Sequence, residues 1–296
     1  MSLFLQLLIQ GLMVGAVYAL VALGFVLIYK SSRVLNLAQG EFMLVWAYIC
    51  WQFWTSLGGA GLPLWLAFPA TFVVVFFMGL LIERVLLRPM IGQPVVGVIM
   101  MTIGLLFFLR GVSTLIWGGP ALSYEPPILP SAGLQLGPIN LSLEYIWSFA
   151  IAAVLLGGFT LFFKYTRMGL AMRATGDDEQ AAQSVGISPR TVYAVSWAIA
   201  AVVATVGGIV IGSMVAISNY MSDVGLAVMA VPLVGGLESV LGVMVAGPII
   251  GVAENLSVYV DWTHGGAKEV APFVIMIIIL LIRPYGLFGL KRIERI

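Results

Sequence analysis

The sequence predicts an all-α protein: a polytopic transmembrane helical bundle with broken or re-entrant helices and about seven to nine membrane crossings. Of its 296 residues, 61% are hydrophobic and only 9% are charged, whereas about a quarter of an ordinary soluble domain is charged. The mean hydropathy is +1.09. The apolar residues also form long continuous runs, which disfavour a β-barrel because barrel strands alternate apolar and polar residues.

Most apolar runs are close to the roughly 20 residues that cross a hydrocarbon core. Charges, or the glycine- and proline-rich turn at 58–63, end many of them, and Arg110 lies inside the outer half of one run. No Lys or Arg precedes Lys30, so we expect a retained first span rather than a cleaved signal peptide. The runs cover residues 3–29, 42–57, 64–82, 95–117, 145–163, 191–217 and 270–282.

The region 224–260 is apolar but interrupted, and it predicts broken or half-depth helices. It makes either two crossings or none, which leaves nine or seven crossings in total as alternatives. The interruptions are Pro232, Gly235, Gly236, Gly242, Gly247, Pro248 and Gly251.

The basic residues predict the orientation. Nearly all of them fall in 30–33, 84–88, 164–190 and 283–295, which the positive-inside rule places in the cytoplasm. The N-terminus is then outside, the C-terminus is inside, and the loop 118–143, which has no Lys or Arg, is external. We expect residues 1–296 to form a single transmembrane domain.

Small residues spaced four apart predict close helix crossings, because they let helix backbones approach each other in lipid. Alternatively, glycine is simply common in membrane helices. The spaced residues are Gly11, Gly15 and Ala19, then Gly208 and Gly212, then Gly247 and Gly251.

Motifs for chemistry are missing. There is no P-loop for ATP, no H-E-x-x-H pair and no G-x-S-x-G turn. The only histidine, His264, is expected in an external turn, and the only cysteine, Cys50, is expected as a packed thiol. We therefore predict no catalytic, cofactor-binding or metal-binding residues, no enzyme activity and, at a net charge of +1, no nucleic-acid partner.

Four ionisable residues lie in or beside apolar runs: Glu41, Arg110, Glu238 and Glu254. A charge at membrane depth is costly and usually marks a transport pathway or an ion pair. The alternative for each is a position near the interface or a satisfied pair.

The polar segment 164–190 contains a short helix, predicted over 178–185, with Gly186 as the residue after its C-cap. Pro189 is expected to open the next span at its first turn. A short helix on the cytoplasmic face offers a docking surface, and the alternative is a solvated loop.

This segment resembles a known family. Gln180-Ala181-Ala182-x-x-x-Gly186 is similar to the Glu-Ala-Ala-x-x-x-Gly loop of ABC-transporter permeases, with Gln in the place of Glu. Three stretches resemble branched-chain amino acid permeases: 34–43, 167–174 and 233–242, the last followed by Gly247. The resemblance covers nearly the whole chain. The chain resembles the first of the two paralogous membrane subunits of such an importer.

The resemblance implies partners and a location. It implies a bacterial inner-membrane, multi-pass permease that pairs with a paralogous second permease, two ABC ATPase subunits and a periplasmic substrate-binding protein. ATP would be used by the ATPases, and this chain would bind no cofactor. The implied ATPase-coupling residues are Asp177, Asp178, Glu179, Gln180, Ala181, Ala182 and Gly186.

A substrate path is expected at two helix breaks, because half-helix ends offer free backbone groups and dipoles to a zwitterion. We expect the two breaks to approach each other, and the alternative is that both are packing turns. The candidates are Asn36, Gln39, Gly40 and Glu41 at the first break, and Gly235, Gly236, Glu238 and Ser239 at the second.

Other functions stay open at this stage. Amide and urea importers share the permease pattern. A secondary transporter or channel that acts alone, or a membrane-embedded enzyme or scaffold, would give the 178–185 helix no obvious role.

Overall fold

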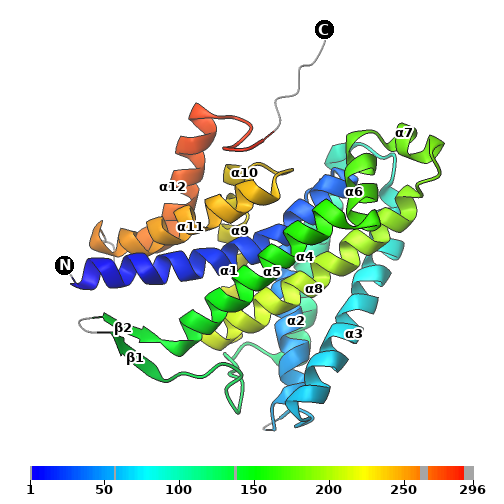
Figure 1. The fold of residues 1–296 in the computed structure, drawn as a ribbon. Coiled ribbons are helices and arrows are strands. Elements are labelled where there is room, and N and C mark those ends of the chain that lie inside the picture. Colours follow the sequence, from blue (N-terminus) through cyan, green and yellow to red (C-terminus); the bar gives the residue numbers. More distant parts are fainter. Residues whose placement is uncertain (1, 57, 137–138, 261–265, 290–296) are drawn as a thin grey trace. The chain divides into compact units, whose positions relative to one another are not determined.

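The fold was obtained as a computed structural model, which describes residues 2–56, 58–136, 139–260 and 266–289 (Figure 1). His264 lies outside these residues, so its expected place in a turn stays a prediction. Within them the regular elements are helices and one β-hairpin, formed by β1 (Gly133–Leu136) and β2 (Ile139–Ser142), which pairs Gly133 with Ser142. The predicted all-α class is confirmed, and the hairpin lies in the loop predicted as external.

The chain folds as two compact units, each built from separate stretches of sequence. Unit 1 contains Met1–Val26, Ser131–Leu156 and Ala227–Ile296, and unit 2 contains Leu27–Pro130 and Gly157–Leu226. The helices α1 (Ser2–Ser32), α5 (Leu143–Tyr165) and α9 (Tyr220–Val228) each have residues in both units. Whether residues 1–296 act as one domain stays a prediction.

Unit 2 is built around α2 (Gln39–Trp54), which packs against α3 (Leu64–Ile82), α4 (Val95–Trp117) and α8 (Pro189–Val215). Nearly all of α2 is buried, including the free thiol of Cys50, so the packed thiol is confirmed. A Cβ on Gly208 of α8 would collide with the carbonyl oxygen of Met43. Gly212 instead faces the side chains of Tyr124 and Ile217, so only the first glycine of this pair marks a helix crossing.

Unit 1 contains the second predicted set of close approaches. Its helices are the first part of α1, with α10 (Ala230–Gly235), α11 (Val240–Leu256) and α12 (Gly266–Ile282). A Cβ on Gly11 would lie 2.7 Å from the carbonyl oxygen of Gly251, and one on Gly15 would lie 2.5 Å from that of Gly247. The small-residue patterns of α1 and α11 therefore pack against each other, which confirms a tight crossing.

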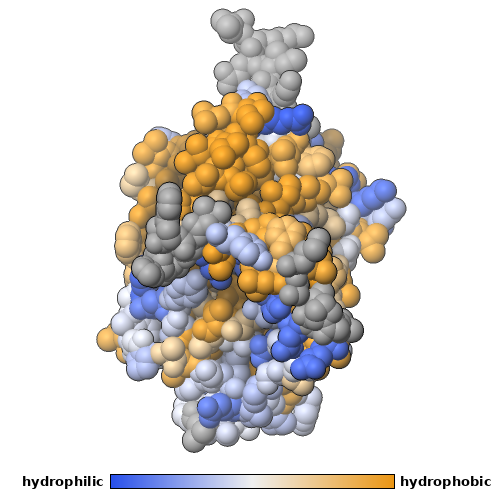
Figure 2. All heavy atoms as spheres, turned by 90° about the vertical axis from the view of Figure 1, so that its left-hand side faces the viewer, coloured by the Kyte–Doolittle hydropathy of each residue, from blue (hydrophilic) through white to orange (hydrophobic). Residues whose placement is uncertain are grey.

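Six helical segments of the described chain are long and apolar enough to cross a membrane. The helices α2 and α12 are shorter, at 16 and 17 residues, so the count of seven to nine crossings is approximate. Exposed apolar side chains recur along the helices, as expected for contact with lipid. On the face shown in Figure 2 they form a broad area in the upper part of the view. The six segments are Leu3–Ser32, Leu64–Met90, Val95–Trp117, Leu143–Tyr165, Pro189–Val215 and Val240–Tyr259.

One predicted boundary was wrong. We expected the charges at 83–88 to end the third span at residue 82, but the helix continues as a π-turn, Glu83–Leu87, and a 3₁₀ turn, Arg88–Met90. Arg88 Nη2 lies 3.4 Å from Glu83 Oε2. The π-turn brings residues five apart onto one face, so the two charges pair with each other and the helix does not need to stop.

The loop 118–130 is attached to the end of α2. Trp51 Nε1 donates to the carbonyl oxygen of Ser123 at 2.9 Å, and Trp54 Nε1 donates to that of Pro126 at 2.7 Å. The hydroxyl of Tyr124 donates to the carbonyl of Ala47 at 3.2 Å, and burial raises the pKa of Tyr124 well above its usual range. These contacts fix the face that the sequence predicts to be external.

Candidate functional site

The first helix break, at the start of α2, is polar and fully buried. Asn36 Oδ1 accepts from the backbone N–H of Ala38 at 3.1 Å, and Asn36 Nδ2 donates to Gln39 Oε1 at 3.2 Å. Both side chains have no exposed surface, and Gln39 Nε2 has no hydrogen-bond partner among the described residues. Gly40 lets α9 approach, because an added Cβ would lie 3.0 Å from the Cα of Gly225.

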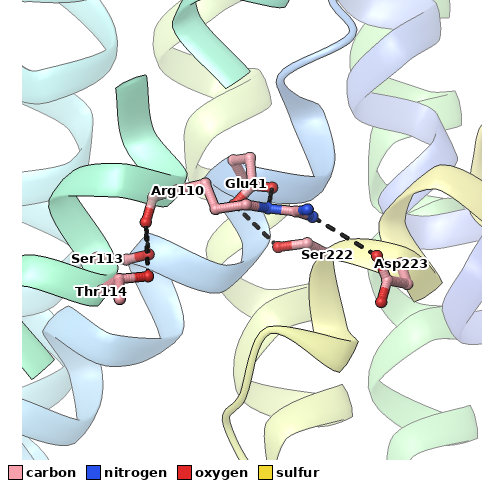
Figure 3. A network of polar contacts seen from close by, with 6 residues as sticks. All are labelled: Glu41, Arg110, Ser113, Thr114, Ser222 and Asp223. Carbon is pink, nitrogen blue, oxygen red and sulfur yellow. Dashed lines mark hydrogen bonds and ion pairs between the residues drawn. The ribbon is translucent and has the colours of Figure 1, made fainter. Parts of the chain in front are cut away.

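Glu41 is the centre of an ionic network that joins three helices (Figure 3). Its carboxylate accepts from Arg110 Nε of α4 at 2.8 Å and from the Ser222 hydroxyl of α9 at 2.9 Å. Asp223 Oδ1 lies 3.6 Å from Arg110 Nη2. Two charges predicted separately from the sequence, Glu41 and Arg110, are therefore a pair.

The backbone carbonyl of Arg110 also accepts hydrogen bonds from two side chains of α4. The hydroxyls of Ser113 and Thr114 both donate to the carbonyl oxygen of Arg110, at 2.9 and 3.0 Å. Such back-bonding within a helix commonly bends it, and here it occurs at the turn that carries the buried ion pair.

The helices α2 and α4 run parallel in a fixed register. Glu41 pairs with Arg110, and seven residues later the ring of Tyr48 stacks on that of Trp117 with centroids 4.9 Å apart. Arg110 is roughly 22 Å along α4 from Val95, at 1.5 Å per residue. The helix α2 therefore begins level with Arg110, well inside the length of α4, as the predicted first break requires.

The second break separates α10 from α11 in unit 1. Gly236 has φ +105°, and the hydroxyl of Ser239 accepts from the backbone N–H of Gly242 at 2.9 Å. Glu238 lies half-buried between them. The backbone N–H groups of Leu287 and Phe288 donate to the carbonyls of Val234 and Gly235 at 2.7 and 3.0 Å. The broken helix is confirmed, and its terminal carbonyls are already paired.

The two breaks belong to different units, so their mutual approach stays a prediction. Glu254, the remaining buried acid, is paired within unit 1: it accepts from the Tyr18 hydroxyl at 3.2 Å and lies 3.6 Å from Lys268 Nζ. Glu254 therefore has ion-pair and hydrogen-bond partners at Oε1, whereas its Oε2 is buried without a hydrogen-bond partner among the described residues.

The polar segment 164–190 forms two helices, α6 (Arg167–Asp177) and α7 (Glu179–Ser184). The side chain of Asp178 caps α7 by accepting from the N–H of Ala181 at 2.9 Å. Gly186 has φ +85°, its N–H donates to Gln183, and the N–H of Ile187 donates to Ala182, which is a Schellman ending. The predicted short helix, the role of Gly186 and the start of α8 at Pro189 are confirmed.

The helix α7 packs against α6 and contacts the first part of α8. Ala182 is buried, while Gln180, Ala181 and Gln183 are exposed. The Tyr193 hydroxyl of α8 donates to Glu179 Oε2 at 2.9 Å. A hollow of about 490 Å³ lies beside this contact, lined by Ile91, Glu179, Gln183, Gly186, Ile187, Ser188, Pro189, Arg190 and Tyr193.

Among the site residues that sequence reasoning missed are Ser222, Asp223 and Tyr193. Ser222 and Asp223 lie just before the apolar region 224–260, where a lone acid was a usable signal. Tyr193 lies 14 residues after Glu179, and no local spacing rule connects the two.

Comparisons with known proteins agree with the resemblance seen in the sequence. The family model described as "Branched-chain amino acid transport system / permease component" matches residues 7–282. The high-affinity branched-chain amino acid transport system permease protein LivH of Salmonella typhimurium is 30% identical over 99% of this chain and 98% of its own length. The high-affinity permease protein BraD of Pseudomonas aeruginosa is 29% identical over the same shares.

Two further similarities cover slightly smaller shares of the chains compared. A probable branched-chain amino acid transport permease protein LivH of Methanocaldococcus jannaschii is 30% identical over 94% of this chain and 90% of its own. Among solved structures, PsaBC from Streptococcus pneumoniae in complex with Fab has a TM-score of 0.49 and 14% identity, and covers 97% of this chain and 94% of that one. That likeness is too weak to bear on the fold or the function.

Proposed function

The chain belongs to the family of branched-chain amino acid transport permease components, and on that premise we propose that it is the membrane permease of an ATP-driven importer of branched-chain, hydrophobic amino acids. It is a multi-pass membrane protein, and we place it in the bacterial inner membrane. In this proposal it forms half of the translocation path beside a paralogous second permease. Two ABC ATPases bind the ATP, and a periplasmic binding protein delivers the substrate.

The observation that carries the proposal is α7, a short helix with an exposed face and two well-made ends. A helix of 6 residues is too short to be stable alone. Its side-chain N-cap and Schellman ending compensate for that, so that the segment offers a rigid surface rather than a solvated loop. This supports docking of an ATPase at Gln180 to Gly186, with Asp177, Asp178 and Glu179 at its start.

The contacts of α8 offer a route for force from α7 to the first helix break. Tyr193 ties the first part of α8 to Glu179 of α7. Farther along, α8 packs against α2 at Gly208 and Met43, and α2 carries Glu41. Because close-packed interiors transmit strain, displacement of α7 would reach the Glu41 network through one helix.

The test is reconstitution of the complete transporter in proteoliposomes, with the binding protein on the substrate side. Leucine uptake should require both ATP and the binding protein, and excess acetamide or urea should not compete. Gly186→Val should uncouple ATP hydrolysis from leucine uptake, because a β-branched residue rarely adopts φ +85° and the end of α7 would be distorted. We expect ATP hydrolysis to continue while uptake falls at least tenfold.

The matched control is Gly92→Val. Gly92 also has positive φ, +81°, and an added Cβ meets nothing within 4 Å, but the residue lies outside α7. Normal uptake by the Gly186 variant, or uncoupling of equal size by the Gly92 variant, would contradict the role of α7. Uphill uptake by the chain without its ATPases would contradict the proposed function as a whole.

A further inference from the structure

The buried partner of Arg110, Glu41, engages only part of the guanidinium group. Its Nε donates to Glu41 at 2.8 Å, and the Glu41 side chain is 2% exposed. A guanidinium has five N–H donors in a planar fork that fits a carboxylate in a bidentate manner. The contact through Nε fixes the orientation of this fork and leaves its outer nitrogens for another group.

The outer nitrogens meet Asp223 loosely. Nη2 lies 3.6 Å from Asp223 Oδ1, longer than the roughly 2.7–2.9 Å of a charge-assisted hydrogen bond. Nη2 itself is buried and has no hydrogen-bond partner among the described residues. A buried donor without a partner costs free energy, so a better acceptor at this position would be favoured.

Exposure rises steadily along the network. The side chains of Arg110 and Asp223 are 33% and 65% exposed, and in Figure 3 the guanidinium extends from Glu41 toward Asp223. Asp223 is thus the outermost member, a carboxylate that covers the fork and can turn away from it. An exposed ion pair of this kind contributes little to stability.

We propose that Arg110 and Asp223 form a binding site for the zwitterionic head of an amino acid, with the substrate carboxylate on the Arg110 fork and the ammonium on Asp223. This rests on the proposed function and names the residues that recognise its substrate. Glu41 and Ser222 are positioning residues, because they hold the guanidinium and do not reach the substrate.

The exchange of partners leaves no charge unpaired. Before binding, Arg110 serves both Glu41 and, weakly, Asp223. After binding, the substrate carboxylate replaces Asp223 on the fork, and the released Asp223 pairs with the ammonium. One loose ion pair becomes two closer ones, which favours a zwitterion over a solute that carries one charge or none.

The test measures displacement of radiolabelled leucine from the purified complete complex in nanodiscs, without the binding protein. The competitors are leucine, 4-methylpentanoate, which lacks the ammonium, and 3-methylbutylamine, which lacks the carboxylate. For the wild type we expect leucine to bind at least tenfold more tightly than either analogue. Glu125→Gln, at an exposed acid of the 118–130 loop, is the matched control and should change nothing.

Asp223→Asn should lower the affinity for leucine at least tenfold. The affinity for 4-methylpentanoate should stay equal or rise, because the Asp223 carboxylate no longer competes for the guanidinium of Arg110. Arg110→Lys should lower the affinity for leucine and 4-methylpentanoate but not for 3-methylbutylamine, because the lysine ammonium cannot bind a substrate carboxylate in a bidentate manner. A merely structural role would lower all three affinities together.

The site would be overturned by parallel losses of affinity for the three competitors in the Asp223 variant, by no loss for leucine, or by a wild type that shows no preference for leucine. If the Asp223→Asn variant co-purifies with less of the second permease but still prefers leucine over the two analogues, Asp223 belongs to a subunit contact instead. Leucine uptake by the same preparation separates the two proposals. If the wild type imports leucine but its preference does not depend on Asp223, only the binding site fails.

Discussion

The two helix breaks differ in the polar groups that they leave without hydrogen-bond partners. At the start of α2, the buried polar groups include an unpartnered amide of Gln39 and an incompletely bonded Arg110. Between α10 and α11, Ser239 caps the new helix, and the chain at 287–288 pairs with the last carbonyls of the old one. A break in a membrane helix is therefore not in itself a binding site, because its groups can be fully used by the protein.

The largest effect should come from removing the charge at the first break. Arg110→Met would leave Glu41 buried and uncompensated, which costs about 3–5 kcal/mol when one partner of a buried pair is removed. Unfolding in detergent, followed by tryptophan fluorescence, would measure it. The double variant Glu41→Gln with Arg110→Met should recover much of the loss, and failure to recover would mean that Arg110 acts through contacts other than Glu41.

A smaller effect is expected at the backbone of the second break. Gly236→Ala forces a side chain into φ +105° and places its Cβ 2.6 Å from the backbone nitrogen of Gly289. Strain of this type costs about 1–3 kcal/mol. The control is Gly104→Ala in α4, where an added Cβ meets nothing within 4 Å. If both variants unfold at the wild-type denaturant concentration, the turn is not rigid and the comparison between the breaks is wrong.

The smallest effect should come from the cap of α11. Ser239→Ala removes the acceptor for the N–H of Gly242 and should cost about 1 kcal/mol, while Ser239→Thr keeps the cap. Because we assign this break to structure, the alanine variant should keep the preference for leucine over 4-methylpentanoate in the displacement assay. A lost preference would place Ser239 in the substrate path, as the sequence first suggested.

Many individual polar and charged residues of these sites were identified from the sequence, but which of them contact each other was not. Glu41 and Arg110 were both visible as charges in apolar runs, yet nothing in a one-dimensional pattern pairs residues 69 positions apart. Asp223 and Ser222 join from a third segment, 181 positions from Glu41 in the case of Ser222. The π-turn at Glu83 was not predicted either, because charged residues after an apolar run indicate a helix end, whereas here Glu83 and Arg88 pair with each other and the helix continues.

Local physics alone determined the apolar spans, the class of the fold and the capped helix at 179–184, since hydropathy and capping act between residues that are near in sequence. The tertiary structure alone decided that α2 starts deep inside the span of α4, that the glycines of α1 face those of α11, and that one guanidinium serves two carboxylates. Those outcomes depend on which helix surfaces meet, and that choice is made by packing between segments that the order of residues leaves far apart.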